Sequence, residues 1–120
     1  MPRVERQAAQ RRGRLAETLA VWWLWVRFYR ILARDWRSPV GELDIVARRG
    51  HILAIIEVKH RASLVQAAEA VSQRQQRRIL RATEQFVALH PGLEKLDWRF
   101  DVLLLAPGRL PRHWLDAFRP

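Results

Sequence analysis

Hydrophobic and polar residues alternate along one stretch in the first half of the chain, and this period of two predicts a β-strand, with a further strand expected on either side of it. The predicted strands are Phe28–Arg34, Glu42–Arg48 and His51–Lys59. Ser38-Pro39-Val40-Gly41 predicts a turn after the first, and Arg49-Gly50 a tight hairpin after the second. In the second strand one face is expected to carry Leu43, Ile45 and Ala47, and the other Glu42, Asp44, Val46 and Arg48.

Helical periods and one strongly apolar run fill the rest of the chain. Residues 15–26 predict a helix, with Leu15, Leu19, Trp22 and Val26 along one face and an opposite side that is also apolar, so burial on more than one side is expected. Residues 65–89 predict a helix with a break near Ser72 and an end at Pro91-Gly92. Trp98–Ala106 is expected as a central strand covered on both faces, and His113–Phe118 as a short edge element. This order predicts an α/β fold with a central mixed β-sheet flanked by helices.

Composition narrows the class of protein. A length of 120 residues fits one domain, residues 15–120, after a basic arm at residues 1–14 that we expect to be flexible. The absence of cysteine excludes disulfides and cysteine-based zinc sites and fits a cytoplasmic setting. The apolar run Leu19–Val26 is too short to cross a bilayer, which needs roughly 20 residues, so no integral membrane association is expected.

The net charge of +10 predicts a polyanionic partner, of which nucleic acid is the commonest inside a cell and a membrane surface is the main competitor. Two rows of side chains are expected on the helix at residues 65–89. The inward row is Val71, Gln75, Ile79, Ala82, Phe86 and Leu89, and the second is Arg74, Arg77, Arg78 and Arg81. The arginine row suits a phosphate backbone, with Arg61 nearby, and the alternative is a solvated helix face. Trp22, Trp23 and Trp25 beside many arginines leave open a protein that docks on a membrane surface or on a partner.

Asp44, Glu57 and Lys59 are expected on one face of the predicted hairpin. With a loop at Arg49-Gly50, Glu42 faces Glu57 and Asp44 lies diagonal to it, and a longer loop keeps the same faces together. Carboxylates on one half-buried sheet face repel each other by up to roughly 1 kcal/mol per pair. A divalent cation would relieve this repulsion, and water activated by the metal beside Lys59 would be a nucleophile for a phosphodiester. The alternative is an ordinary set of charged residues on a solvated face.

The rarity of lysine in this chain favours a metal site over an ordinary solvated face. Only Lys59 and Lys95 are lysines among 22 basic residues, so an ammonium group at position 59 is unusual for this chain.

The segments Gly41-Glu42-Leu43-Asp44-Ile45-Val46-Ala47 and Glu57-Val58-Lys59-His60-Arg61 resemble the YraN-like family of small bacterial proteins. Further matching segments at residues 33–37, 99–102 and 117–118 extend the resemblance from about Gly13 to Phe118. That family is placed within the PD-(D/E)xK nuclease superfamily, closest to archaeal Holliday junction resolvases. The resemblance therefore implies a restriction-endonuclease-like core and a metal-dependent endonuclease acting on DNA that is branched or otherwise structured.

The resemblance also implies roles for individual residues. Asp44 and Glu57 would bind Mg²⁺ or Mn²⁺, together with the backbone carbonyl of Val58 and with Glu17 from the first helix. Lys59 would orient the attacking water or stabilise the transition state. Homodimerisation is an expectation that comes from the resolvase-like relatives alone.

The sequence departs from the family pattern at a few positions. The family usually has Gly where Ala16 and Phe28 stand, Asn where Asp35 stands, and Lys where Gln75 stands. Gln75 is still expected in the catalytic set, as a hydrogen-bonding group. The lost charge motivates the alternative function, a nucleic-acid-binding protein that keeps the nuclease fold without cleaving. Asp101, two residues after Arg99, is expected to form a structural ion pair rather than to bind metal.

Overall fold

The computed structural model describes residues 17–61 and 64–120, so the arm predicted at residues 1–14 lies outside the described residues. After a helix at residues 17–26, the elements are β1 (Arg30–Ser38), β2 (Gly41–Arg49), β3 (Ile52–His60), α2 (Leu64–Glu69), α3 (Gln73–Leu89), the 3-10 helix η1 (Leu93–Lys95), β4 (Asp97–Leu105) and β5 (Arg112–Trp114). The five strands form one sheet in the order β1-β2-β3-β4-β5, in which only β3 and β4 run parallel. The predicted α/β class with a mixed sheet is confirmed.

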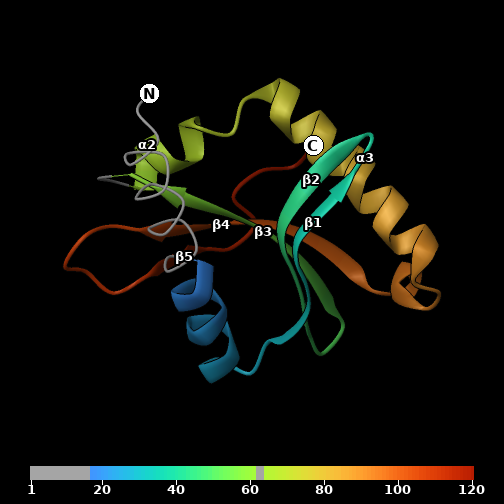
Figure 1. The fold of residues 1–120 in the computed structure, drawn as a ribbon, viewed down its shortest axis with the longest axis horizontal. Coiled ribbons are helices and arrows are strands. Elements are labelled where there is room, and N and C mark those ends of the chain that lie inside the picture. Colours follow the sequence, from blue (N-terminus) through green and yellow to red (C-terminus); the bar gives the residue numbers. More distant parts are fainter. Residues whose placement is uncertain (1–16, 62–63) are drawn as a thin grey trace, which may run out of the picture.

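Each face of the sheet is covered by a helix, and Figure 1 shows α3 and the helix at residues 17–26 on opposite sides. Phe86 and Ile79 of α3 are buried with Leu53 and Ile55 of β3 in one hydrophobic cluster. On the other face the helix at residues 17–26 covers a second cluster, which includes Ala54 and Ile56. The alternation predicted along β3 is therefore confirmed. β4 is buried from Phe100 to Leu105, as expected of a central strand covered on both faces.

The first helix is buried on the side opposite Leu19 and Trp22, so the expected burial on more than one side is wrong. Ala20 and Leu24 are the fully buried residues of this helix, whereas Leu19, Trp22 and Val26 are 43%, 56% and 41% exposed. Because the helix is apolar on nearly every side, periodicity could not choose a face. Alanine and leucine allow the helix to approach the sheet, and the bulky tryptophan at position 22 stays outside.

The predicted break near Ser72 is confirmed. Ser72 is the N-cap of α3, and its hydroxyl oxygen accepts a hydrogen bond from the Gln75 N–H at 3.1 Å. The cap fixes the first turn of α3 and so the direction in which Gln75 leaves the helix. At the other end α3 stops at Leu89, before Pro91 as predicted, but Leu89 is exposed and does not extend the buried row.

The β2–β3 hairpin turns one residue later than predicted. Its loop is Gly50-His51, with Arg49 paired to Ile52 and Ile45 to Ile56. Gly50 has a positive φ of 59°, and it occupies the first loop position, where a type II′ turn requires glycine. Continuing this register places Asp44 opposite Glu57, so the predicted pairing of Glu42 with Glu57 is wrong.

The β1–β2 hairpin switches faces halfway along its length. Leu43 and Val46 belong to the same hydrophobic cluster, although strict alternation would separate them, so the predicted grouping of Leu43 with Ile45 and Ala47 is wrong. The switch occurs where Asp35 adopts a positive φ of 50° within β1. The pairs on either side, Arg34 with Ile45 and Trp36 with Leu43, put Asp35 opposite Asp44. Aspartate and asparagine tolerate this left-handed conformation better than other residues with a side chain.

A second left-handed residue ends the helix at residues 17–26. Phe28 has a φ of 70°, and the N–H groups of Phe28 and Tyr29 donate to the carbonyls of Trp25 and Leu24 at 3.0 Å each. This pair of bonds is a Schellman motif, whose left-handed position is usually glycine.

Phe28→Gly is expected to raise the free energy of unfolding by roughly 1 kcal/mol, because glycine adopts this conformation without the penalty that a side chain suffers. Phe28 loses little packing, since it is 87% exposed. Urea unfolding measures the difference. Trp22→Gly is the matched control, an exposed aromatic residue inside the helix, and its stability should fall by roughly 1 kcal/mol. A decrease in both variants would contradict the assigned strain.

Candidate active site

The sheet splits into two halves at the predicted site. Pairing between β2 and β3 ends at Ile45 and Ile56, whereas β2 stays paired with β1 to Gly41 and β3 with β4 to His60. Asp44 and Glu57 are the first residues beyond the last pair. The split therefore leaves a gap between two strands with one carboxylate on each side.

Asp44 bridges the gap. Its Oδ2 accepts a hydrogen bond at 2.9 Å from the Val58 N–H, which has lost its strand partner at the split. In a strand, the N–H and C=O of one residue point to the same neighbour, so the Val58 carbonyl also faces the Asp44 side. The two backbone groups and the carboxylate thus meet on one side of β3.

Glu57 is buried, with 3% of its surface exposed, and is held by two side chains. Its Oε2 accepts a hydrogen bond from Gln75 Nε2 at 3.1 Å and lies 3.9 Å from Lys59 Nζ. The structure therefore brings together Asp44, Glu57, Lys59 and Gln75, which the sequence placed in one catalytic set. Lys59 reaches the carboxylate from the same face of β3, as period-two alternation predicted.

The two carboxylates strongly perturb each other. Burial and the neighbouring Asp44 raise the pKa of Glu57 to about 8, although Lys59 opposes the shift. Burial also raises the pKa of Asp44, against the effects of the Val58 N–H and of Lys59. The pair therefore retains a proton near neutral pH that two independent carboxyls would lose. Perturbed acids gathered in a cleft are a common property of catalytic and metal sites.

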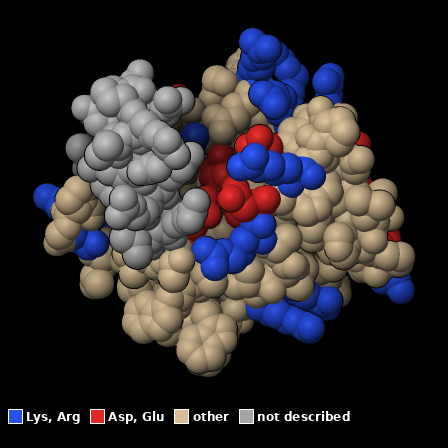
Figure 2. Space-filling view, viewed as in Figure 1, with Lys and Arg blue, Asp and Glu red and all other residues tan. Residues whose placement is uncertain are grey.

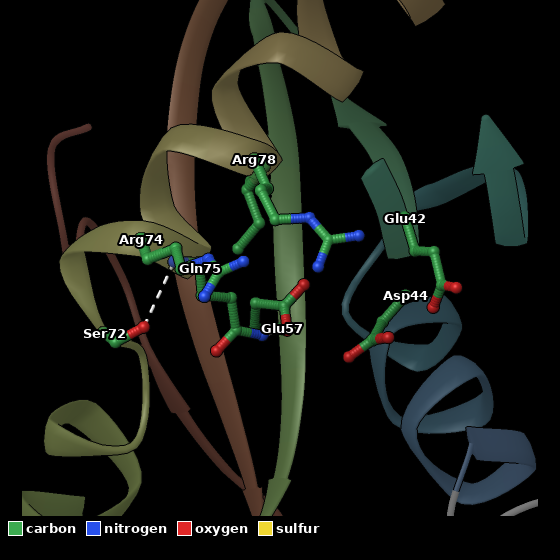
Figure 3. Close-up of a pocket in the computed structure, with 8 residues that line it drawn as sticks. Glu42, Asp44, Glu57, Ser72, Arg74, Gln75 and Arg78 are labelled. Atoms are coloured by element: carbon green, nitrogen blue, oxygen red, sulfur yellow. Dashed lines mark hydrogen bonds between the residues drawn. The ribbon is translucent and has the colours of Figure 1, made fainter. Parts of the chain in front are cut away.

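A cleft of about 540 Å³ contains this pair. Its lining comes from β2, β3 and the start of α3: Glu42, Asp44, Glu57, Ser72, Arg74, Gln75, Arg78 and Ile79. Figure 3 shows Gln75 and Arg78 reaching from α3 toward Glu57, with Glu42 and Asp44 on the opposite wall. On the surface, acidic side chains gather in one hollow between basic ones (Figure 2).

Glu17 lies beside this cleft rather than in its lining. Burial raises its pKa, and the charges of Asp35 and Asp44 raise it further, so the three carboxylates are neighbours. Within residues 17–61 and 64–120, however, no group of three or more Asp, Glu, His or Cys side chains is arranged to hold a metal ion. The proposed ligands thus need the Val58 carbonyl and water to complete a coordination shell.

Comparison with known proteins decides the family. A model of the Uncharacterised protein family UPF0102 matches residues 16–105. The chain belongs to UPF0102. It is 52% identical over 114 residues to a UPF0102 protein of Bradyrhizobium diazoefficiens, covering 95% of this chain and 86% of the relative. It is 51% identical over 113 residues to one from Nitrobacter winogradskyi, covering 94% and 96%. The YraN-like resemblance seen in the sequence is thereby supported at the level of this family.

The predicted basic residues lie along one surface of α3. Arg74, Arg77, Arg78 and Arg81 are exposed, and with Pro39 and Val40 of the β1–β2 turn they line a second hollow of about 350 Å³. Arg74 and Arg78 line both hollows, so the row joins the carboxylate cleft to the hairpin turn. Arg61 is exposed just beyond β3, and its guanidinium donates to the His60 carbonyl at 2.7 Å.

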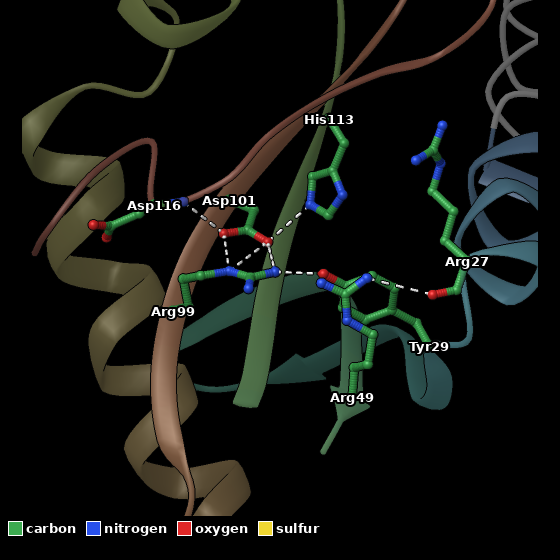
Figure 4. A network of polar contacts seen from close by, with 7 residues as sticks. All are labelled: Arg27, Tyr29, Arg49, Arg99, Asp101, His113 and Asp116. Carbon is green, nitrogen blue, oxygen red and sulfur yellow. Dashed lines mark hydrogen bonds and ion pairs between the residues drawn. The ribbon is translucent and has the colours of Figure 1, made fainter. Parts of the chain in front are cut away.

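Asp101 belongs to a separate structural network, as predicted (Figure 4). It is fully buried, and it accepts hydrogen bonds from Arg99 and from the Asp116 N–H and pairs with His113 at 2.8 Å. Although burial opposes ionisation, these partners keep the pKa of Asp101 below its usual value. Arg99 also donates to the Tyr29 hydroxyl at 2.6 Å, which ties β4 to the end of the first helix.

Two residues of the site were not among the predicted set. Asp35 faces Asp44 across the β1–β2 pairing, and Glu42 lines the cleft and adds to the negative charge around Glu57. Alternation along the second strand was an available signal for Glu42, whereas no periodicity shows a left-handed residue inside a strand such as Asp35. Within the described residues, no helix is both long and apolar enough to cross a membrane.

Proposed function

We propose that this protein is a metal-dependent endonuclease that acts on DNA inside the cytoplasm, with a restriction-endonuclease-like core. The observation that carries the proposal is the meeting of Asp44, Glu57 and Lys59 at the split between β2 and β3. A buried Glu57 beside a half-buried Asp44, both with raised pKa values, is unfavourable for folding alone. A chain gains from that arrangement when the pair binds a cation.

The donor set suits Mg²⁺ or Mn²⁺. Carboxylates and a backbone carbonyl are hard oxygen ligands, and Mg²⁺ normally keeps several waters, so Asp44, Glu57 and the Val58 carbonyl form a reasonable partial shell. Glu17 would contribute from beside the cleft. The ion, when bound, supplies an activated water and stabilises the charge that develops on the phosphate.

The remaining side chains would position the substrate. Lys59 carries its ammonium 3.9 Å from Glu57, where it can orient a water or neutralise a phosphate oxygen. Arg78 and Arg74 bring positive charge to the opposite rim of the cleft. The rest of the arginine row continues away from the site, so a phosphate backbone following α3 would enter the cleft at its acidic centre.

A cleavage screen tests the proposal. The full chain is incubated with duplex, flap, four-way junction and single-stranded DNA, with Mg²⁺, Mn²⁺ or a chelator. We expect cleavage of at least one substrate only when a divalent metal is present, and at least about 100-fold slower cleavage by Lys59→Ala. Cleavage that persists in the chelator would overturn the proposal.

A non-catalytic nucleic-acid-binding protein is the second candidate. Two observations favour it: Gln75 is neutral where the resembling family usually has lysine, and no group of three ligating side chains is arranged for metal among the described residues. Salt-sensitive DNA binding without cleavage on any substrate, and without metal uptake by calorimetry, would select this alternative.

Gln75→Lys is expected to increase cleavage near neutral pH. The new ammonium would take the place of the amide that now lies 3.1 Å from Glu57 and would lower the pKa of that carboxyl from about 8. The acidic limb of the pH–rate profile should therefore move to lower pH. Gln76→Lys is the matched control, because the Gln76 amide donates to the Val71 carbonyl instead. An identical shift in both variants would assign the effect to overall charge.

A further inference from the structure

Three aromatic side chains are exposed at the end of the first helix. Trp22, Trp25 and Phe28 are 56%, 67% and 87% exposed, and we call them the aromatic patch. Trp22 and Trp25 are three residues apart on the helix and so lie on one side of it. The Phe28 N–H donates to the Trp25 carbonyl at 3.0 Å, which places the third ring at the same end.

The backbone keeps Phe28 outside the core despite strain. Its φ of 70° is a conformation that a bulky residue adopts rarely. Strain at an exposed aromatic residue brings no packing in return, and such positions are concentrated at functional sites. The patch therefore needs an explanation outside folding.

Positive charge borders the patch. The Arg27 guanidinium lies 4.2 Å from the centre of the Trp23 ring, and that of Arg49 lies 4.4 Å from the Tyr29 ring. No acidic residue occurs between Thr18 and Arg34. A hollow of about 770 Å³ is lined by Trp25, Val26, Phe28, Tyr29, Arg30 and Ile31, so apolar rings and a cation share one depression.

We propose that the aromatic patch binds the bases of single-stranded nucleic acid, with Arg27, Arg30 and Arg49 holding its phosphates. Flat rings beside arginines are the combination that binds a single strand without reading its sequence. A second copy of the chain would bring the same arginines face to face and would be repelled. The inference deepens the proposed function, because it names the strand type that the protein takes.

The patch and the carboxylate cleft lie along one helix. Its first turn contacts the sheet next to the site, through a hydrogen bond of 3.4 Å from Arg34 to Thr18, and Arg34 directly precedes Asp35. From Glu17 to the helix end the rise is roughly 15 Å, at about 1.5 Å per residue. Figure 1 shows the helix leading into the turn before β1.

The test compares two polymers with the same backbone charge. One is a thymidine oligonucleotide of about 12 nucleotides, and the other is an abasic deoxyribose-phosphate chain of the same length. Binding of the full chain is measured by fluorescence anisotropy in a chelator, where cleavage cannot occur. We expect the thymidine chain to bind at least about 10-fold more tightly. The triple variant Trp22→Ser/Trp25→Ser/Phe28→Gly should reduce that ratio to within about 2-fold.

Trp114→Ser is the matched control and should keep the full ratio. Trp114 is an exposed tryptophan on β5 that pairs with Val102, so its side chain lies on the sheet face opposite the first helix. A ratio near one for the unaltered protein would overturn the proposal. The proposal would also be overturned if the patch tryptophans bound anionic lipid vesicles, or a second copy of the chain, and no base-dependent binding were seen. Base-dependent binding without metal-dependent cleavage would support strand binding by the aromatic patch and refute the proposed nuclease activity. Metal-dependent cleavage with a binding ratio near one would support the nuclease activity and refute strand binding by the patch.

Discussion

Asp44→Asn is expected to reduce metal-dependent cleavage by on the order of 10³-fold while leaving the fold intact. The asparagine carbonyl oxygen can still accept the hydrogen bond that Asp44 Oδ2 now takes from the Val58 N–H, so the bridge across the split remains. The negative charge and one of the two ligand oxygens are lost. The half-buried position makes this loss large, because little solvent replaces the missing charge.

Glu42→Gln provides the matched control for this prediction. It removes the same charge from the same cleft, but Glu42 is exposed and lies on the rim. We expect its cleavage rate to stay within about 5-fold of the unaltered protein, as is usual for a screened surface charge. Single-turnover rates at saturating metal separate the two variants. Comparable losses in both would show that the cleft needs negative charge in general and that Asp44 is no specific ligand.

The local sequence pattern was sufficient to predict the elements that carry this site. The alternation along β3 placed Glu57 and Lys59 on one face, and the cap at Ser72 placed the break between α2 and α3. Each of these features depends on a few neighbouring residues, so the sequence contains the information directly. The same holds for Asp101, whose partner Arg99 is two residues away on the same strand.

Features that depend on distant pairings could not be predicted. The register of the β2–β3 hairpin depends on whether Gly50 is the first or the second loop residue, and glycine is common at both positions of a two-residue turn. The change of face along the β1–β2 hairpin depends on the left-handed backbone of Asp35. That conformation could not be predicted from the neighbouring residues without knowing how β1 pairs with β2. The register of the same two strands puts Asp35 opposite Asp44. The exposed side of the first helix was equally undetermined, because nearly every side is apolar.

Glu57→Gln is expected to stabilise the metal-free protein at pH 8 by on the order of 3 kcal/mol. The pKa of Glu57 is about 8 in the folded state and 4.5 in its ordinary state. The folded protein therefore binds this proton more tightly than the unfolded chain, and its stability falls as pH rises from about 5 to 8. Glutamine does not titrate, and its amide can donate to Asp44 where the shared proton stood.

Urea unfolding in a chelator at pH 5 and pH 8 measures the effect. The unaltered protein should lose stability between the two values, and Glu57→Gln should lose much less. Excess Mg²⁺ should then restore the stability of the unaltered protein at pH 8 and leave the stability of the variant unchanged. Binding to the folded state adds about 2.7 kcal/mol to the free energy of unfolding at 100 times the Kd. Equal pH slopes in both proteins would refute the assigned proton. A variant that is more stable yet inactive would mean that the carboxylate pair is kept for metal binding at the expense of the fold.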